Sequence, residues 1–407
     1  MTKEGTVSEQ LDIYKNELNT ELGNILKYWI DNTQDDVHGG FYGKIDNDNR
    51  VIRDAPKGSV LNARILWSFS AAYNLTKNAE YLAMADSAYR YLTEYIIDKQ
   101  YGGVYWMVDY DGQKLDTKKQ VYASAFAIYG LSEYYRATGS KEALNEAIDL
   151  YKLLVEKSFD KHQTGYLEAF TEDWKPIKDL RLSAKDANEK KTMNTHLHVL
   201  EAYTNLYSIW PDKSLRTQIV LLLNNFLYYF IDAETGHLNL FFDENWNKRS
   251  TLVSYGHDIE AAWLLLESAE VINDAELIVK FKELAVKISE STLDGLDKDG
   301  GLWYEYEPAD DQLIKEKHWW VQAEAMVGFF NVWQITGEEK YLRLSLKNWR
   351  FVKAKILDQK NGEWFWGINE YGHVMRTEDK AGLWKCPYHN SRACIEIIKR
   401  ITTSTTK

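Results

Sequence analysis

The chain has 407 residues, of which 45% are hydrophobic, and it carries 61 acidic against 49 basic side chains. Its formal charge of -12 disfavours nucleic acid or an anionic membrane surface as a partner. No apolar run approaches the roughly eighteen residues of a membrane span, and the N-terminal stretch lacks the apolar core of a signal peptide. We therefore expect a soluble, cytoplasmic protein without a membrane partner.

Aromatic residues are unusually frequent, at 14% of the chain, with 15 Trp and 27 Tyr. Because aromatic faces stack on the C–H faces of sugar rings, this composition favours carbohydrate as the ligand. The two cysteines, Cys386 and Cys394, form neither a CxxC pair nor part of a wider framework. They are best explained as packed thiols in a reducing compartment.

The predicted elements begin with a helix from about Ser8 to Ile30, after which a repeat runs along the chain. A Gly followed by alternating aromatic and apolar residues recurs six times, at intervals of 63, 62, 71, 65 and 61 residues. Its period of two indicates a short strand or hairpin. The aligned glycines are Gly40, Gly103, Gly165, Gly236, Gly301 and Gly362.

Two helical segments separate one glycine motif from the next, for example Val60–Leu75 and Tyr81–Ile97. With the leading helix and a last helix after Pro387, the chain has twelve predicted helices. Six helix pairs with a period above roughly 50 residues predict a closed ring, an all-α (α/α)6 barrel with short β-hairpins or turns at one mouth. We predict one domain over residues 1–407, because no linker interrupts the repeats.

The helix that follows each turn would begin at the mouth of this ring, so its first two turns present side chains to one common space. A single polar residue on an apolar helix is usually satisfied core, but a full set at one level favours a site. The polar and aromatic residues at this level are Arg64, Tyr122, Asn194, His198, His257, Glu260, Trp319, Trp320, Glu324 and His389.

His196 and His198 lie two residues apart on a predicted helix, so their side chains point about 200° apart and cannot bind one metal ion. Asn194 and His198 are four residues apart and share a face. We therefore predict that His198 points inward and that His196 is a buried, hydrogen-bonded structural residue.

His257 and Glu260 are three residues apart, which lets the carboxylate orient the imidazole and raise its basicity. His389 follows Pro387 in the first turn of its helix, where the positive end of the helix dipole favours neutral imidazole. Both histidines are therefore candidate bases near neutral pH. For the histidines in or beside turns we expect solvated or turn-structural roles; they are His38, His162, His237, His318 and His373.

Trp320 and Trp384 are candidates for sugar-stacking walls, with packing of the ring as the alternative. The charged connection from Trp174 to Lys190 is best explained as a solvated loop. In the alternative, it orders over the mouth and places Asp186 as a further ligand-binding candidate. No P-loop, dinucleotide fingerprint, GxSxG or HExxH motif occurs, so we predict neither a cofactor nor a metal.

Two histidine bases beside an arginine and a third histidine suit removal of a proton next to a carbonyl, as at C2 of an opened aldose. Return of the proton to the opposite face inverts C2, whereas return to C1 makes a ketose. Two other classes stay open: a non-catalytic sugar-binding protein and an inverting glycosidase. A glycosidase would need carboxylates about 6.5 to 9.5 Å apart, for which Glu260 and Glu324 are candidates.

Five strings in order along nearly the whole chain carry a resemblance to a known family. They are "NARILWSFS", "NTHLHVLEAYT", "SYGHDIEAAWLL", "KHWWVQAEAMVGF" and "GLWKCPYHNSRAC". These strings resemble the cellobiose 2-epimerases of the N-acylglucosamine 2-epimerase superfamily. The resemblance implies an (α/α)6 barrel that interconverts the reducing-end glucose of β-1,4-linked disaccharides with mannose, without a cofactor. Its substrates would be cellobiose, lactose and mannosyl-glucose, with glucosyl-mannose and epilactose as products.

The same resemblance implies roles for individual residues. His257 and His389 would form the acid/base pair, and Arg64 and His198 would hold the carbonyl and enediolate oxygens. Glu260 would orient His257. The sugar contacts would be Asn194, Tyr122 and Asp186, with Trp320 and Trp384 stacked on the rings. Mannose aldose–ketose isomerases and N-acylglucosamine 2-epimerases share the barrel and stay alternatives. We expect a monomer or a weak homodimer.

Overall fold

The computed structural model describes residues 5–404, and this range contains twelve α-helices, as the repeat predicts. Six of them form an outer layer: α1 (Val7–Asn32), α3 (Ala79–Tyr91), α5 (Lys141–Lys157), α7 (Lys213–Asn225), α9 (Ala275–Thr292) and α11 (Glu339–Phe351). Six form an inner layer: α2 (Ser59–Thr76), α4 (Val121–Thr138), α6 (Met193–Tyr207), α8 (Tyr255–Val271), α10 (Trp319–Thr336) and α12 (Tyr388–Ser404). A π-helical turn extends three outer helices, at Leu92–Ile96, Phe226–Phe230 and Val352–Ile356.

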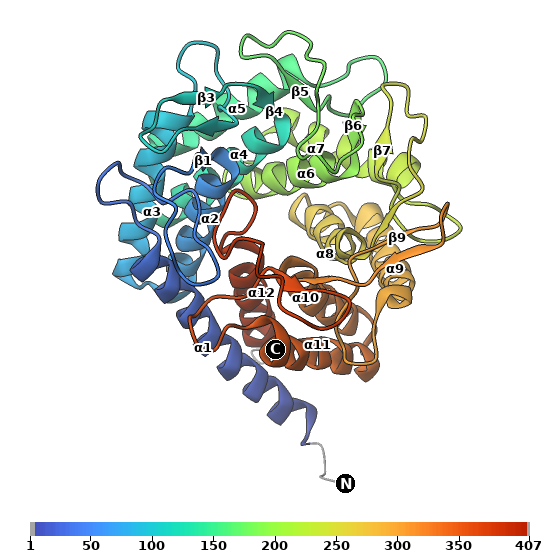
Figure 1. The fold of residues 1–407 in the computed structure, drawn as a ribbon. Helices are drawn as coiled ribbons and strands as arrows, with labels where there is room; N and C mark the ends of the chain where they lie inside the picture. Colours follow the sequence, from blue (N-terminus) through green and yellow to red (C-terminus); the bar gives the residue numbers. More distant parts are fainter. Residues whose placement is uncertain (1–4, 405–407) are drawn as a thin grey trace.

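The inner helices form a closed ring (Figure 1). Each packs against the next along the chain, and α12 packs against α2, which closes the circle. The outer helices cover the ring, with α3, α5, α7, α9 and α11 each on the inner helix that precedes it and α1 on α12. This arrangement is an (α/α)6 barrel, as predicted.

The two layers differ in how their sequences distribute apolar residues. Helix α10 is buried on every face, with an unbroken run of buried residues from Val321 to Val332. Helix α11 buries one stripe that includes Tyr341, Leu342 and Trp349, and it leaves charged residues outside. A helix that is apolar all round belongs inside, whereas an amphipathic helix covers a core. One hydrophobic cluster draws on all twelve helices, and a single domain over residues 1–407 stays a prediction.

Short antiparallel strands link neighbouring units at the mouth. The strand that leads into an inner helix pairs with a strand of the next unit: β1 with β2, β4 with β5, β6 with β7, β8 with β9 and β11 with β12. In β4 and β5, for example, Gln120 lies opposite Ala169. Each of the six glycine motifs also folds back on itself as a short antiparallel hairpin, which confirms the predicted strand or hairpin per motif. Within the described residues these hairpins are β2–β3, β9–β10 and the single bridges Ile45–Val51, Phe170–Pro176, Phe242–Lys248 and Ile368–Val374.

The strands are two or three residues long. Their bounds are β1 (Lys57–Gly58), β2 (Met107–Val108), β3 (Lys114–Asp116), β4 (Lys119–Gln120), β5 (Ala169–Phe170), β6 (Lys191–Thr192), β7 (Phe241–Phe242), β8 (Val253–Ser254), β9 (Glu305–Glu307), β10 (Gln312–Ile314), β11 (Lys317–His318) and β12 (Gly367–Ile368).

The pairing between units also satisfies the first N–H groups of the inner helices. The Ser59 N–H donates to the Trp106 carbonyl at 3.1 Å, and the Trp319 N–H donates to the Trp366 carbonyl at 2.8 Å. An unpaired N–H at a buried helix start is costly. The turn of one unit thus fixes the start of the inner helix before it, which holds the mouth-facing side chains at one height.

In the third motif, a steric reason requires glycine at position 165. Its φ is +80°, and a Cβ there would lie 2.6 Å from the Trp246 ring and 2.8 Å from the His196 imidazole. Only glycine suits both the left-handed backbone and this close approach.

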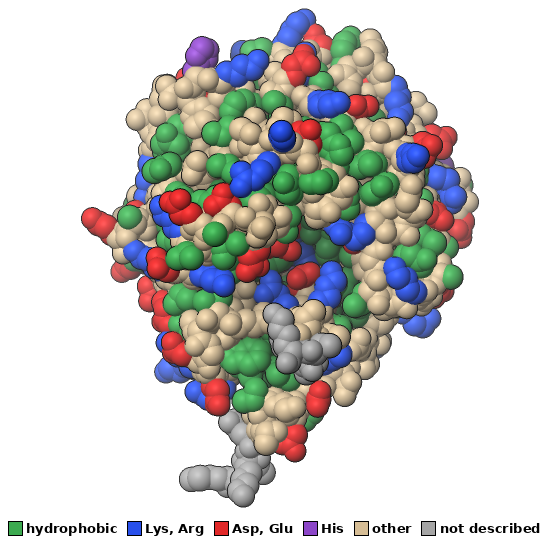
Figure 2. All heavy atoms as spheres, turned by 180° about the vertical axis from the view of Figure 1, so that it is seen from behind, with side chains coloured by type: hydrophobic (Ala, Val, Ile, Leu, Met, Phe, Trp, Pro, Cys, Tyr) green, Lys and Arg blue, Asp and Glu red, His purple; other side chains and the backbone are tan. Residues whose placement is uncertain are grey.

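No helix within residues 5–404 is long and apolar enough to cross a membrane. On the face that Figure 2 shows, Lys and Arg side chains are interspersed with Asp and Glu side chains. Such mixing leaves no continuous basic surface on that face. Cys386 and Cys394 are free and buried, as predicted for packed thiols.

Candidate active site

A cavity of about 460 Å³ opens at the mouth of the ring. Its volume lies within the range of small-molecule sites. The first turns of the inner helices and the turns between them line it. All ten site residues predicted from the sequence lie in its wall: Arg64, Tyr122, Asp186, Asn194, His198, His257, Glu260, Trp320, Trp384 and His389.

Arg64 is a buried cation at the base of this cavity. Its Nη2 donates to the Tyr122 hydroxyl at 2.6 Å, and its guanidinium lies 4.1 Å from the centre of the Phe126 ring. Among the described residues no carboxylate forms an ion pair with Arg64, and its buried Nε has no hydrogen-bond partner. A buried charge without a counter-ion is costly. Arg64 is therefore well suited to hold an oxygen that gains negative charge.

His198 is paired with a carboxylate that the sequence prediction missed. Its Nδ1 lies 2.8 Å from Glu201 Oε2, so Nδ1–H donates to the carboxylate and leaves Nε2 as the free ring nitrogen. Burial opposes ionisation of Glu201, but the Arg392 guanidinium and the bond from His198 outweigh it and lower the pKa to about 2. For His198 itself, burial lowers the pKa despite Glu201.

The predicted pairing of His257 with Glu260 is wrong. The Nδ1 atom of His257 lies 2.8 Å from the Ser254 hydroxyl, while Glu260 Oε1 accepts from Arg392 at 2.6 Å. Spacing along the helix allowed the contact, but the guanidinium binds the carboxylate more strongly than a neutral imidazole does. The predicted gain in basicity is also wrong, since burial lowers the pKa of His257 to about 3.

His389 lies in the first turn of α12, as predicted, and its Nδ1 is 2.7 Å from Glu324 Oε1. Burial lowers its pKa well below the ordinary value, and the positive charges of Arg64 and Arg392 act in the same direction. The imidazole is therefore neutral near neutral pH and can accept a proton.

Trp320 lies beside both of these histidines. Its ring centre is 4.8 Å from that of His257 and 5.6 Å from that of His389. On another wall, Trp384 lies 5.9 Å from Tyr122. Trp320 and Trp384 are half-buried, so each keeps ring surface for a ligand. The imidazoles of His257 and His389 thus both lie next to the Trp320 ring in the cavity wall.

Arg392, which the sequence prediction also missed, joins the carboxylates behind these histidines. Its Nη2 donates to Glu260 Oε1 and Glu324 Oε1, each at 2.6 Å, and its Nη1 donates to Glu201. Ligand atoms of Glu260, Glu324 and His389 lie within 4.8 Å of one another, which is a spacing that could hold a metal ion. The Arg392 guanidinium already bonds both carboxylates of this group, so a structural ion-pair cluster explains it.

The chain is similar to known proteins along almost its whole length. The family model of N-acylglucosamine 2-epimerase (GlcNAc 2-epimerase) matches residues 40–393. This chain belongs to the N-acylglucosamine 2-epimerase family. A cellobiose 2-epimerase of Bacteroides fragilis is 48% identical, covering 95% of this chain and 99% of that protein. A cellobiose 2-epimerase of Dictyoglomus turgidum is 40% identical, covering 96% of this chain and 100% of that protein.

A solved structure supports the same relationship. The cellobiose 2-epimerase from Bacillus thermoamylovorans B4167 is 43% identical and superposes with a TM-score of 0.91, covering 96% of this chain and 100% of that chain. This member of the N-acylglucosamine 2-epimerase family therefore has the same fold as that cellobiose 2-epimerase.

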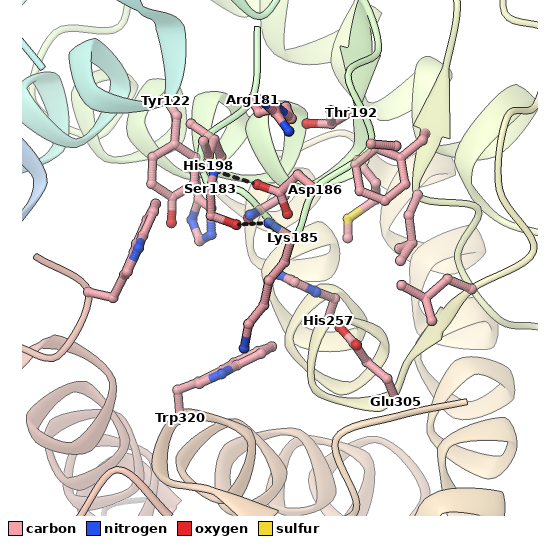
Figure 3. Close-up of a pocket in the computed structure, with 18 of the residues that line it drawn as sticks. Tyr122, Arg181, Ser183, Lys185, Asp186, Thr192, His198, His257, Glu305 and Trp320 are labelled. Atoms are coloured by element: carbon pink, nitrogen blue, oxygen red, sulfur yellow. Dashed lines mark hydrogen bonds between the residues drawn. The ribbon is translucent and has the colours of Figure 1, made fainter. Parts of the chain in front are cut away.

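The connection between Trp174 and Lys190 differs from the solvated loop that the sequence favoured. Its residues from Leu180 to Ala187 line the cavity, so the alternative, ordering over the mouth, is correct. Asp186 accepts from the Ser183 N–H at 2.8 Å, which turns the loop, and Lys185 extends into the cavity towards Trp320 (Figure 3). The charge of the loop could not predict its position, because a charged loop can cover a polar cavity as readily as it faces water.

Two other histidine predictions had opposite outcomes. His196 is buried, accepts from the Tyr166 N–H at 2.8 Å and lies 2.7 Å from the Thr192 carbonyl, so its structural role is confirmed. The solvated or turn-structural role expected for His318 is wrong, since it is buried in the cavity wall. It stacks on Tyr304, with ring centres 4.0 Å apart.

Proposed function

We propose that the protein is a cofactor-independent sugar epimerase that inverts C2 of the reducing-end glucose in β-1,4-linked disaccharides. It converts cellobiose to glucosyl-mannose and lactose to epilactose, and mannosyl-glucose is a further substrate of the same type. The relatives named cellobiose 2-epimerase support the substrate class. The observation that carries the chemistry is a buried guanidinium without an ion-pair partner beside neutral imidazoles.

The reaction begins when the sugar ring opens and the proton of O1 passes to O5, which gives the aldehyde. One of His257 and His389 then takes the proton from C2. The electrons of that C–H bond form the C1–C2 double bond, and the carbonyl oxygen becomes an enediolate oxygen. Arg64 donates to this oxygen, and His198 supports it with Glu201 behind its other ring nitrogen.

The second histidine completes the inversion. Once the enediolate has formed, this histidine takes up a proton from solvent and gives it to the opposite face of C2, and the aldehyde forms again. The first histidine later releases its proton to solvent, so protons balance over the cycle. Both imidazoles lie next to the Trp320 ring, so a sugar bound against this ring is within reach of two bases.

The remaining wall of the cavity binds the disaccharide. Trp320 and Trp384 stack on the sugar rings. The Oδ1 atom of Asn194 is buried without a hydrogen-bond partner, so a sugar hydroxyl that donates to it removes an energetic cost. Tyr122 and Asp186 also line the cavity and supply further polar contacts.

Other functions fit the geometry less well. An inverting glycosidase needs two carboxylic acids separated by a water molecule, at about 6.5 to 9.5 Å. Glu260 and Glu324 instead share one nitrogen of Arg392, which leaves no room for that arrangement. An aldose–ketose isomerase would use the same first step but return the proton to C1. A cytoplasmic location and a monomer or weak homodimer stay predictions.

Incubation of the purified protein with cellobiose and with lactose, followed by chromatography and NMR of the products, tests the proposal. We expect glucosyl-mannose and epilactose. Free glucose would indicate a hydrolase instead, and glucosyl-fructose alone would indicate an isomerase. Conversion of N-acylglucosamine with no change of cellobiose would move the protein to the other epimerase branch.

A further inference from the structure

Arg392 is the most extensively bonded side chain behind the cavity, although it does not line the cavity. It is almost fully buried, at 1% exposure, and lies in α12 one turn after His389. Its guanidinium donates to three carboxylates on three other inner helices, Glu201 of α6, Glu260 of α8 and Glu324 of α10. It also donates to the Tyr388 hydroxyl.

Two of these carboxylates, Glu201 and Glu324, also form a hydrogen bond with a histidine. Glu201 bonds Arg392 through Oε1 and His198 through Oε2, at 2.8 Å from Nδ1. Glu324 uses Oε1 for both Arg392 and His389, at 2.7 Å from Nδ1. An unbroken chain of charge-assisted hydrogen bonds therefore runs from His198 through Glu201, Arg392 and Glu324 to His389.

We propose that Arg392 is a positioning residue that fixes His198 and His389 through Glu201 and Glu324 and couples the protonation of the two imidazoles. This inference rests on the proposed function, in which His389 transfers a proton and His198 supports the enediolate. When His389 gains a proton, its positive charge acts on His198 through the shared guanidinium. The pKa of His198 therefore falls while His389 is charged, and the converse also holds.

The planar fork of arginine suits this place, because it reaches carboxylates in several directions at once. A lysine would keep the charge but supply a single nitrogen, which cannot bond Glu201 on one side and Glu260 and Glu324 on the other. The separate helices that carry these carboxylates would then lose their common anchor. A lysine at position 392 keeps the charge and loses the shape, whereas a neutral residue loses both. Comparing the two variants therefore separates the effect of the charge from that of the hydrogen-bond geometry.

The charges around His389 give the direction of the effect. Carboxylates face it from α6, α8 and α10, guanidinium groups from α2 and α12, and His198 from α6; these groups are Glu201, Glu260, Glu324, Arg64, Arg392 and His198. Tyr388 also touches its ring. Arg392 is one of the positive charges that lower the pKa of His389, so its removal lets that pKa rise.

The test compares Arg392→Lys and Arg392→Gln with a control, Arg343→Gln, which removes an exposed arginine on α11. We would measure kcat and KM for cellobiose across pH, with circular dichroism to verify folding. In Arg392→Gln we expect the acid limb of kcat/KM to move up by about one pH unit. We expect kcat to fall about tenfold or more, with little change in KM. Arg392→Lys should keep the limb and recover kcat only in part.

Several outcomes would overturn the inference. An acid limb that stays in place in a folded Arg392→Gln variant removes the coupling, and full wild-type kcat in Arg392→Lys removes the positioning role. If the glutamine variant does not fold, the lysine variant decides alone. If the wild type and Arg343→Gln do not epimerise cellobiose, the proposed function has failed. NMR titration of ¹⁵N-labelled histidines in the same variants then decides whether Arg392 controls the two imidazoles.

Discussion

His257 and His389 lie in the first turns of α8 and α12, yet their ring nitrogens have different partners. Ser254, a neutral hydroxyl, is next to the Nδ1 atom of His257, whereas the carboxylate of Glu324 is next to that of His389. Burial holds both imidazoles neutral in the resting protein. At His389, the charges of Arg64 and Arg392 add to burial in opposing a proton, while Glu324 lies next to Nδ1.

Removal of either imidazole should stop the reaction. We expect His257→Ala and His389→Ala each to lower kcat by about 10² to 10⁴ or more, because each removes a proton-transfer group. Steady-state assays with cellobiose would measure this. His162→Ala, which changes an exposed turn histidine, serves as the control and should keep wild-type turnover. Near-normal activity in either site variant would refute the two-base assignment.

The pH dependence of kcat/KM should reflect the buried histidines. Burial lowers their pKa below the ordinary 6.5, so the base form persists as the pH falls through that value. We therefore expect the acid limb of the profile to lie below 6.5. Folding stability should decline in the same range, since the unfolded chain takes up protons near 6.5 that the folded chain excludes. An acid limb above 6.5, in protein shown to be folded, would contradict this account.

At the level of elements, buried ion pairs connect the turns to the inner helices. A lysine just before an inner helix binds an aspartate of a preceding turn in Lys57–Asp35, Lys119–Asp98, Lys191–Asp160 and Lys317–Asp297. The fourth unit has Val253 in the lysine position. There His237 bonds Asp258 of α8 instead, at 2.7 Å. These pairs set the height at which each inner helix begins.

Breaking one such pair should cost more than breaking a surface pair. Both partners in Lys119–Asp98 are fully buried, so Lys119→Met leaves an uncompensated carboxylate and should destabilise the protein by about 3 to 5 kcal/mol. The matched control, Lys114→Met, removes an exposed pair with Glu172 and should cost about 1 kcal/mol or less. Urea unfolding would measure both, and equal losses would refute the structural role of the buried pair.

The order of elements could be predicted from the sequence, because the glycine motifs and apolar periods are local signals. The partners of Arg392 could not, since Glu260 and Glu201 lie 132 and 191 residues away along the chain. One signal was available. The sixth residues of α2, α4, α6, α8 and α10 are Arg64, Phe126, His198, Glu260 and Glu324, and Arg392 lies one position earlier in α12, as its fifth residue.

The loop above the mouth could not be predicted for a different reason. Its residues are as charged as those of a solvated connection. The loop takes its ordered position because it covers the cavity, which the local sequence does not indicate. For Glu260, sequence spacing indicated a partner on the same helix, whereas the structure pairs it with Arg392 of α12. Local sequence patterns therefore predicted the helices, but the hydrogen-bond partners in the site depend on charged residues that are far apart along the chain.

At the scale of the whole molecule, ring closure creates the site. Helix α12 packs against α2, which brings Arg64 near the start of the ring together with His389 and Arg392 near its end (Figure 1). Arg64 lies 4.7 Å from the Tyr388 ring across this junction. Each inner helix contributes one or two groups, so the proposed chemistry needs the complete circle.

The most direct test of proton transfer at C2 is incubation with cellobiose in D2O, followed by NMR of the recovered disaccharides. The account predicts glucosyl-mannose that carries deuterium at C2, because the proton returned to that carbon comes from a histidine in exchange with solvent. Glucosyl-mannose that forms without deuterium at C2 would contradict the two-histidine enediolate route.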